Sequence, residues 1–156
     1  MGVDYDAQKV WAEVWERIRP TPADIHQSRT AYVASRFKNR ELVTAFSAKL
    51  LTKKPPIHCI QSWSVPGSVM DQWTEAACAE QDVQEILSVP RVIVLTENCE
   101  LTPGGMNFET GFAYAKGKRV IVVGPRVHVF HYLPQIEWYP SIQAYFESFG
   151  ADAWEV

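Results

Sequence analysis

A glutamate in a glycine-rich segment is the first residue of this sequence whose type and position could serve chemistry. Residues 102–124 read TPGGMNFETGFAYAKGKRVIVVG, and Glu109 lies near the middle of that segment. Gly104 and Gly105 allow a sharp turn and a close approach to a ligand, and Asn107 can cap the helix that follows. The segment therefore predicts a carboxylate in the first turn of a helix, directly after a loop.

Two interpretations of Glu109 follow from this position. An acidic side chain in a first helical turn complements the helix dipole and needs no further role. The loops at the carboxyl ends of parallel strands are, however, also the places where open α/β sheets bind ligands. Position alone makes Glu109 a candidate site residue and leaves both interpretations open.

Three other predicted loops could border the same site. Ser35 and Arg36 follow the first predicted strand, where a helix N-terminus and basic side chains could receive an anion, or where the loop is simply solvated. Trp63 closes the second predicted strand, and its ring could stack on a planar base or fill the core. Arg126 follows the fourth predicted strand and could face the site from there.

The elements that must position these side chains alternate along the chain. Five predicted strands cover residues 30–34, 57–63, 90–95, 119–123 and 136–139. Predicted helices cover 5–19, 40–51, 69–88 and 141–149, besides the one that carries Glu109 and ends at Gly117. Such alternation predicts an α/β fold, a flavodoxin- or Rossmann-like three-layer sandwich with a five-stranded parallel sheet. Residues 1–29 are expected to form an amphipathic helix and connector outside the domain of residues 30–156.

On the predicted helix of residues 69–88, Asp82 lies off the apolar stripe. Helical periodicity alone therefore leaves its side chain in solvent.

Composition excludes several classes of partner. The chain has 156 residues, of which 47% are hydrophobic and 21% charged, which predicts a globular domain rather than a disordered chain. A net charge of -3 without any long basic run gives no reason to expect a nucleic-acid or membrane surface, so a small molecule is the expected partner. Widely spaced cysteines without a CxxC pair, and an N-terminus without a secretory signal, predict a cytoplasmic protein.

Longer stretches of the sequence resemble a known family. Residues 80–123, EQDVQEILSVPRVIVLTENCELTPGGMNFETGFAYAKGKRVIVV, resemble the core of the nucleoside 2-deoxyribosyltransferase superfamily. YVASRF is similar to the family's first strand and loop, and GPRVHVFHYLP to an extension found in small phage and bacterial members. The likeness covers residues 30–149. It implies an enzyme that cleaves the N-glycosidic bond of a 2′-deoxynucleoside and passes the sugar to another nucleobase.

The resemblance also implies roles for particular residues. Glu109 matches the family nucleophile, which attacks the sugar C1′, and Asp82 matches the acid that handles the nucleobase. Breaking this bond builds positive charge on the sugar and negative charge on the base, so one carboxylate should stay ionised while another group supplies a proton. The pocket implied by the match is lined by Tyr32, Ser35, Arg36, Trp63, Asn98, Thr102, Gly104, Gly105, Met106 and Arg126.

One departure from the family pattern keeps other functions open. Transferases of the family often carry an aspartate six residues before the nucleophile, and Pro103 stands there in this chain. Relatives that hydrolyse deoxynucleoside 5′-monophosphates hold the phosphate with small hydroxyl residues, a role open to Ser35 and Thr102 with Arg36 or Arg126 nearby. A non-catalytic nucleotide binder on the same fold is the third alternative.

The resemblance implies no metal or organic cofactor. It does imply a homo-oligomer, because the family completes its pockets with residues of a neighbouring subunit.

Overall fold

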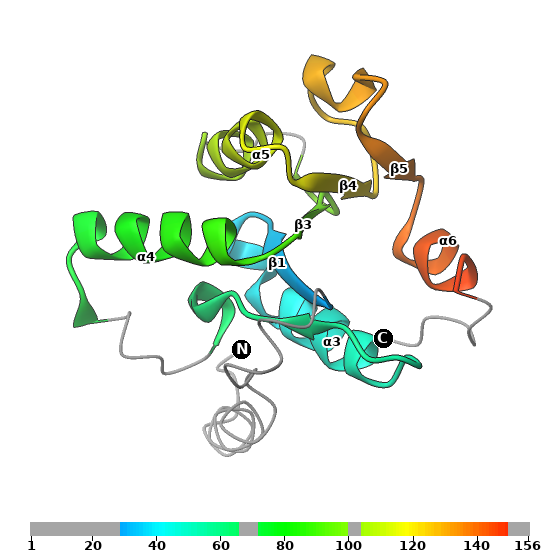
Figure 1. Ribbon diagram of the computed structural model, residues 1–156, viewed down its shortest axis with the longest axis horizontal. Coiled ribbons are helices and arrows are strands. Elements are labelled where there is room, and N and C mark those ends of the chain that lie inside the picture. The colour runs from blue at the N-terminus through cyan, green and yellow to red at the C-terminus, as the bar shows by residue number, and fades with distance from the viewer. Residues whose placement is uncertain (1–28, 66–71, 100–103, 150–156) are drawn as a thin grey trace.

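A five-stranded parallel sheet forms the centre of the computed structural model, which describes residues 29–65, 72–99 and 104–149 (Figure 1). The strand order is β2-β1-β3-β4-β5, and every neighbouring pair is parallel. The strands are β1 (Thr30–Ala34), β2 (His58–Cys59), β3 (Arg91–Leu95), β4 (Arg119–Val123) and β5 (Glu137–Tyr139). This arrangement confirms the predicted α/β class.

Helices cover both faces of the sheet. Their bounds are α3 (Arg40–Leu51), α4 (Glu75–Ser88), α5 (Gly105–Ala115) and α6 (Ile142–Glu147), with short 3-10 helices η1 (Phe37–Asn39), η2 (Ser62–Ser64) and η4 (Val129–Tyr132). Alternate residues of a strand point to opposite faces. Ala31 and Val33 of β1 accordingly pack in a core with α3 and α6, while Tyr32 and Ala34 pack in a second core with α4 and α5. Figure 1 shows these two helix pairs on opposite sides of the sheet, as a three-layer sandwich requires.

The second strand is shorter than predicted because side chains take over its hydrogen bonds. Residues 57–63 were expected to be extended, but only His58 and Cys59 pair with β1 in a strand. Beyond them, the Gln61 side chain accepts a hydrogen bond from the Val33 amide at 3.2 Å, and the Trp63 indole donates to the Val33 carbonyl at 3.0 Å. The edge of β1 is therefore satisfied without a longer partner strand.

The helix before β3 also differs from its prediction. The sequence suggested a start at residue 69, whereas α4 begins at Glu75, and the Thr74 side chain caps it by accepting from the Ala77 amide at 3.2 Å. Residues 69–71 lie outside the described residues, as does the whole helix predicted over residues 5–19.

The start of α5 corrects the placement of Glu109. Gly104 is the N-cap residue, and it has ordinary helical backbone angles (φ -59°) rather than the sharp turn expected of it. Asn107 lies inside the first turn instead of capping it, so Glu109 falls in the second turn. Because helix-dipole effects fade within the first turn, that interpretation of Glu109 is weakened.

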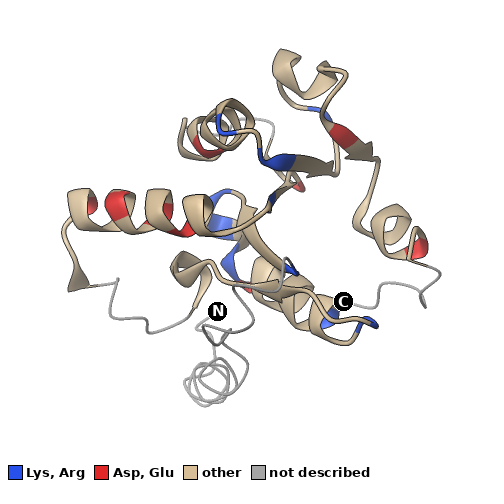
Figure 2. Ribbon diagram, in the orientation of Figure 1, with Lys and Arg blue, Asp and Glu red and all other residues tan. Residues whose placement is uncertain are grey.

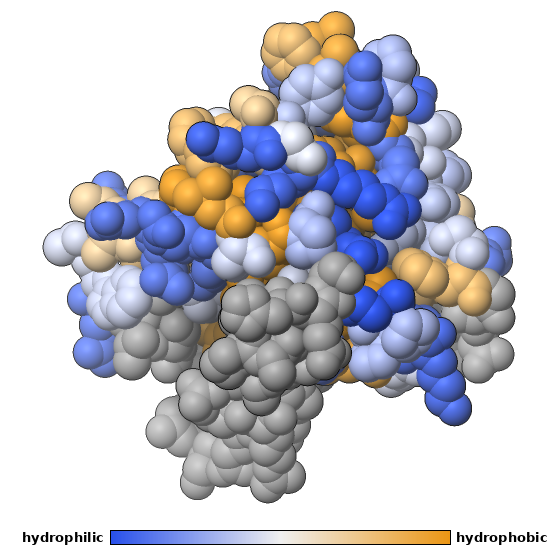
Figure 3. All heavy atoms as spheres, in the orientation of Figure 1, coloured by the Kyte–Doolittle hydropathy of each residue, from blue (hydrophilic) through white to orange (hydrophobic). Residues whose placement is uncertain are grey.

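Within the described part of the chain, no helix combines the length and apolar character that a membrane crossing needs. Apolar atoms gather at the tip formed by η4, where Val129 is 73% exposed and Phe130 62% (Figure 3).

Candidate functional site

The candidate site lies at the carboxyl ends of β1 and β3. The chain passes from β1 to β2 on one side and then to β3 on the other, so β1 and β3 flank the topological switch point where such sheets bind ligands. Ser35, directly after β1, donates its hydroxyl to the Leu95 carbonyl at 2.6 Å. The two strand ends are thus held together at the base of the site.

Two cavities meet at the acidic residues of this region. One, of about 280 Å³, is lined by Ser35, Arg36, Phe37, Trp63, Asp82, Gly105, Met106 and Glu109. The other, of about 610 Å³, extends between α4 and α5 and shares Asp82, Gly105 and Glu109 with the first. Figure 2 shows acidic residues on both of these helices. The carboxyl groups of Asp82 and Glu109 therefore stand where a ligand could extend into either cavity.

Tyr32 brings a third polar group to this junction. It is fully buried on β1 and faces the α4 and α5 layer. Among the described residues, its hydroxyl, Oδ1 of Asp82 and Oε2 of Glu109 are buried without a hydrogen-bond partner. A buried polar atom left unsatisfied costs about 1–3 kcal/mol. Three such atoms from three separate elements are typical of a site that gains its hydrogen bonds from a ligand.

Burial sets the charge of the two carboxyls. The pKa of Glu109 is raised to about 8, chiefly by desolvation and to a smaller extent by the charges of Asp82 and Glu85. The pKa of Asp82 is raised to about 6, again chiefly by desolvation and then by Glu85. Contact with the Tyr32 hydroxyl lowers both pKa values, although its geometry falls short of a hydrogen bond.

The order of these pKa values differs from the roles implied by the resemblance. With these pKa values Asp82 ionises before Glu109, whereas a nucleophilic Glu109 would have to be the ionised group. Because the two groups interact, the proton belongs to the pair, and a bound ligand can decide which carboxyl holds it.

Glu85 holds two elements of the site together through its hydrogen bonds. It lies one helical turn after Asp82 and accepts hydrogen bonds from the Ser62 amide at 3.0 Å and from Gln81 at 3.0 Å, as well as from the Ser62 hydroxyl. Its pKa is also raised, chiefly by burial. Glu85 ties α4 to η2, which carries Trp63 into the cavity wall. In the sequence, the only signal for Glu85 is its three-residue spacing from Asp82 on a helix, and Glu85 was not among the predicted site residues.

Hydrogen bonds also join the loops after β1 and β3. Nη1 of Arg36 donates to the Asn98 carbonyl at 2.5 Å, and Nδ2 of Asn39 donates to the Glu97 carbonyl at 2.6 Å. The same Asn39 nitrogen donates to the Ser35 hydroxyl at 3.0 Å. Asn98 has a positive φ of 55°, which asparagine tolerates better than most residues. Arg36 is thereby held at the cavity wall.

Most of the predicted site residues with described positions come together. The larger cavity is lined by Gly104. The smaller cavity is lined by seven of them: Ser35, Arg36, Trp63, Asp82, Gly105, Met106 and Glu109. Arg126 does not line either: its guanidinium lies 4.0 Å from the ring centre of Trp138 and 4.5 Å from that of Tyr132. Thr102 lies outside the described residues.

The described part of the chain contains no group of three or more histidine, cysteine, aspartate and glutamate side chains that could hold an ion.

Comparisons with protein-family models, with curated proteins and with solved structures find no match to this chain.

Proposed function

We propose that the protein cleaves the N-glycosidic bond of a 2′-deoxynucleoside and transfers the deoxyribosyl group to a second nucleobase. The observation that carries the proposal is the convergence of Tyr32, Asp82 and Glu109, each with a buried polar atom that has no partner in the described residues. The resemblance of the sequence around Asp82 and Glu109 to the nucleoside 2-deoxyribosyltransferase superfamily names the reaction.

The protonation of the pair suits this chemistry. With pKa values near 6 and 8, the two carboxyls together hold about one proton near neutral pH. The reaction needs one ionised carboxylate for the sugar and one proton for the leaving base. Positive charge developing at C1′ favours ionised Glu109, and the proton then resides on Asp82.

The bonds can be followed through both half-reactions. A Glu109 oxygen forms a bond to C1′ as the bond from C1′ to the base nitrogen breaks, and Asp82 gives its proton to the departing base. The acceptor base then attacks C1′, releases Glu109 as a carboxylate and returns a proton to Asp82. The two cavities that meet at the carboxyls offer room for sugar and base on either side of C1′.

Arg36 favours a second candidate, hydrolysis of deoxynucleoside 5′-monophosphates. Its side chain and that of Ser35 line the smaller cavity together, where they could hold a phosphate. Arg126, the other arginine considered for that role, stacks on aromatic rings away from the cavity. If this candidate is right, water replaces the acceptor base and turnover depends on Arg36.

Chromatography of reaction mixtures tests both candidates. Purified protein is incubated with deoxynucleosides and their 5′-monophosphates, each with and without a second free base. A new nucleoside that forms only with the acceptor base establishes transfer, whereas free base and free sugar phosphate establish hydrolysis. If no substrate is consumed, both are wrong, and a non-catalytic nucleotide binder becomes the better proposal.

A single substitution tests the role of Glu109. Glu109→Gln removes the nucleophile while keeping the size of the side chain, and it should lower turnover at least about 1000-fold. Glu41→Gln, which alters an exposed carboxylate on α3, is the matched control and should leave turnover unchanged. Full activity of Glu109→Gln would refute a covalent role for this residue.

A further inference from the structure

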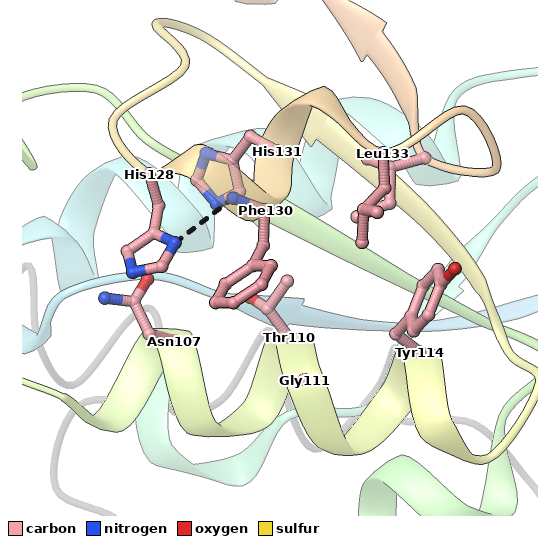
Figure 4. A pocket seen from close by; sticks show the side chains of 9 residues that line it. Asn107, Thr110, Gly111, Tyr114, His128, Phe130, His131 and Leu133 are labelled. Atoms are coloured by element: carbon pink, nitrogen blue, oxygen red, sulfur yellow. Dashed lines mark hydrogen bonds between the residues drawn. The ribbon is translucent and has the colours of Figure 1, made fainter.

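A third cavity lies on the opposite face of α5 from the candidate active site. Its volume is about 320 Å³, and its walls are formed by α5 and by the segment around η4. Figure 4 shows side chains of α5 facing those of the segment that carries His128 and His131. On one face, α5 lines the cavities of the candidate active site with Gly105, Met106 and Glu109. On its other face, α5 lines the third cavity with Asn107, Thr110, Gly111 and Tyr114.

A glycine opens the helix side of this cavity. Gly111 lies in the interior of α5, where glycine costs roughly 0.5–1 kcal/mol relative to alanine. Packing does not require it, since a Cβ at this position would meet no atom within 4 Å, and its φ is not in the left-handed region. The missing side chain leaves space in the cavity wall.

Polar atoms without partners line the same space. His131 is only 1% exposed, and among the described residues neither of its ring nitrogens has a hydrogen-bond partner. Oδ1 of Asn107 is likewise buried and unpartnered. Two other polar groups of the lining are occupied: the Tyr114 hydroxyl donates to Gln135 at 3.0 Å, and Nδ1 of His128 accepts from the Phe130 amide at 3.3 Å.

The lining also indicates what kind of molecule would fit. Among the described residues that line the cavity there is no aspartate, glutamate, lysine or arginine. Burial, followed by the neighbouring His128 and Arg126, lowers the pKa of His131, so its imidazole is neutral at neutral pH. A neutral imidazole offers one donor and one acceptor, and the Asn107 oxygen offers a second acceptor. The rings of Phe130 and Tyr114 supply flat apolar surface beside them.

We propose that this cavity is a second ligand site, which binds a small, neutral, planar heterocycle that carries both a hydrogen-bond donor and an acceptor. The heterocycle would pair with His131 and Asn107 and pack against Phe130. Because α5 also carries Glu109, such a ligand would contact the helix that positions the active-site carboxylate. The proposal rests on the cavity itself and does not require the proposed enzymatic activity.

NMR titration of the full-length protein tests the site with adenine, hypoxanthine and cytosine as probes and toluene as the apolar control. Amide signals of residues 107–114 and 128–133 and the ring nitrogens of His131 are followed. We expect saturable shifts of these signals with at least one heterocycle. Absence of shifts with all three, or equal shifts with toluene, would overturn the proposal.

Two glycine variants separate this cavity from the active site. Gly111→Leu fills the cavity and should weaken binding at least tenfold, whereas Gly111→Ala leaves most of the space and should bind as the native protein does. A heterocycle in the active site alone would bind both variants equally, which contradicts the proposal.

A third variant covers the case in which Gly111→Leu does not fold. His131→Phe keeps a ring but removes both nitrogens, and it should lose the preference for heterocycles over toluene. An unchanged preference would show that His131 does not contact the ligand.

Discussion

The buried carboxyl of Glu109 should make the protein less stable as pH rises. Its pKa is raised from the ordinary value of 4.5 to about 8, so between these two pH values the folded chain holds a proton that the unfolded chain has lost. The free energy of unfolding therefore falls by about 1.4 kcal/mol per pH unit over that interval. Below pH 4.5 both states are protonated, and above pH 8 both are ionised, so the effect levels off at each end.

The size of the effect follows from the interval. About 3.5 pH units at about 1.4 kcal/mol each amount to about 5 kcal/mol, a large share of the 5–15 kcal/mol that stabilises a typical domain. Glu109→Gln has no proton to lose at this position. Its advantage over the native protein should grow from near zero below pH 4.5 to about 5 kcal/mol above pH 8.

Denaturant unfolding at a series of pH values from 4.5 to 9 measures this difference. Asp82 and Glu85 also have raised pKa values, so they too lower the stability of the folded protein as pH rises. Both residues are present in the native protein and in Glu109→Gln, so their contribution largely cancels in the difference between the two. The exposed Glu41→Gln control should follow the native curve. A difference between native protein and Glu109→Gln that stays within about 1 kcal/mol throughout would refute the inference that Glu109 is desolvated.

Three further substitutions test particular contacts. Tyr32→Phe removes a buried hydroxyl without a partner in the described residues, so it should leave stability unchanged or raise it by up to about 1 kcal/mol while turnover falls at least tenfold. Ser35→Ala leaves the Leu95 carbonyl without its 2.6 Å hydrogen bond and should cost about 1–3 kcal/mol. Gly124→Ala should cost more than about 2 kcal/mol, because φ is 116° there and a Cβ would lie 2.5 Å from Oγ1 of Thr96.

Thermal and denaturant unfolding give the stability changes, and the chromatographic assay gives turnover. Gly111→Ala is the control for Gly124→Ala, since it adds the same methyl group in open space and should raise stability by about 0.5–1 kcal/mol. Equal effects of the two glycine substitutions would contradict the steric argument. A loss of stability in Tyr32→Phe matching that of Ser35→Ala would mean that the Tyr32 hydroxyl has a partner in the folded protein.

Local sequence was sufficient to predict most elements of the sheet. The β-branched runs of β3 and β4 predicted their strands to within one residue, and the predicted bounds of β1 and α3 are those observed. Such segments are buried on both faces or have one apolar stripe, so their patterns are read without knowledge of the rest of the chain. The parallel direction of neighbouring strands then followed from the alternation of strands and helices.

Elements whose hydrogen bonds are completed by distant side chains were predicted less well. Residues 60–63 look like strand by composition, but Gln61 and Trp63 satisfy the edge of β1 through their side chains. The predicted cap of α5 at Asn107 was wrong for a related reason, since α5 begins at Gly104 without any side-chain cap. These outcomes depend on partners that a local window does not contain.

The candidate site shows the same division between sequence and structure. The sequence was sufficient to predict a five-stranded parallel sheet, and it supplied Glu109 as a candidate from its position after a glycine-rich loop, whereas the strand order and hence the switch point came from the structure. Periodicity predicted a solvated Asp82, yet Asp82 comes to lie beside Glu109 and the buried Tyr32, where its pKa rises to about 6. Tertiary packing placed it there, because desolvation and charge coupling depend on which of α4, α5 and β1 face each other, and that packing joins residues 27, 50 and 77 positions apart in the chain.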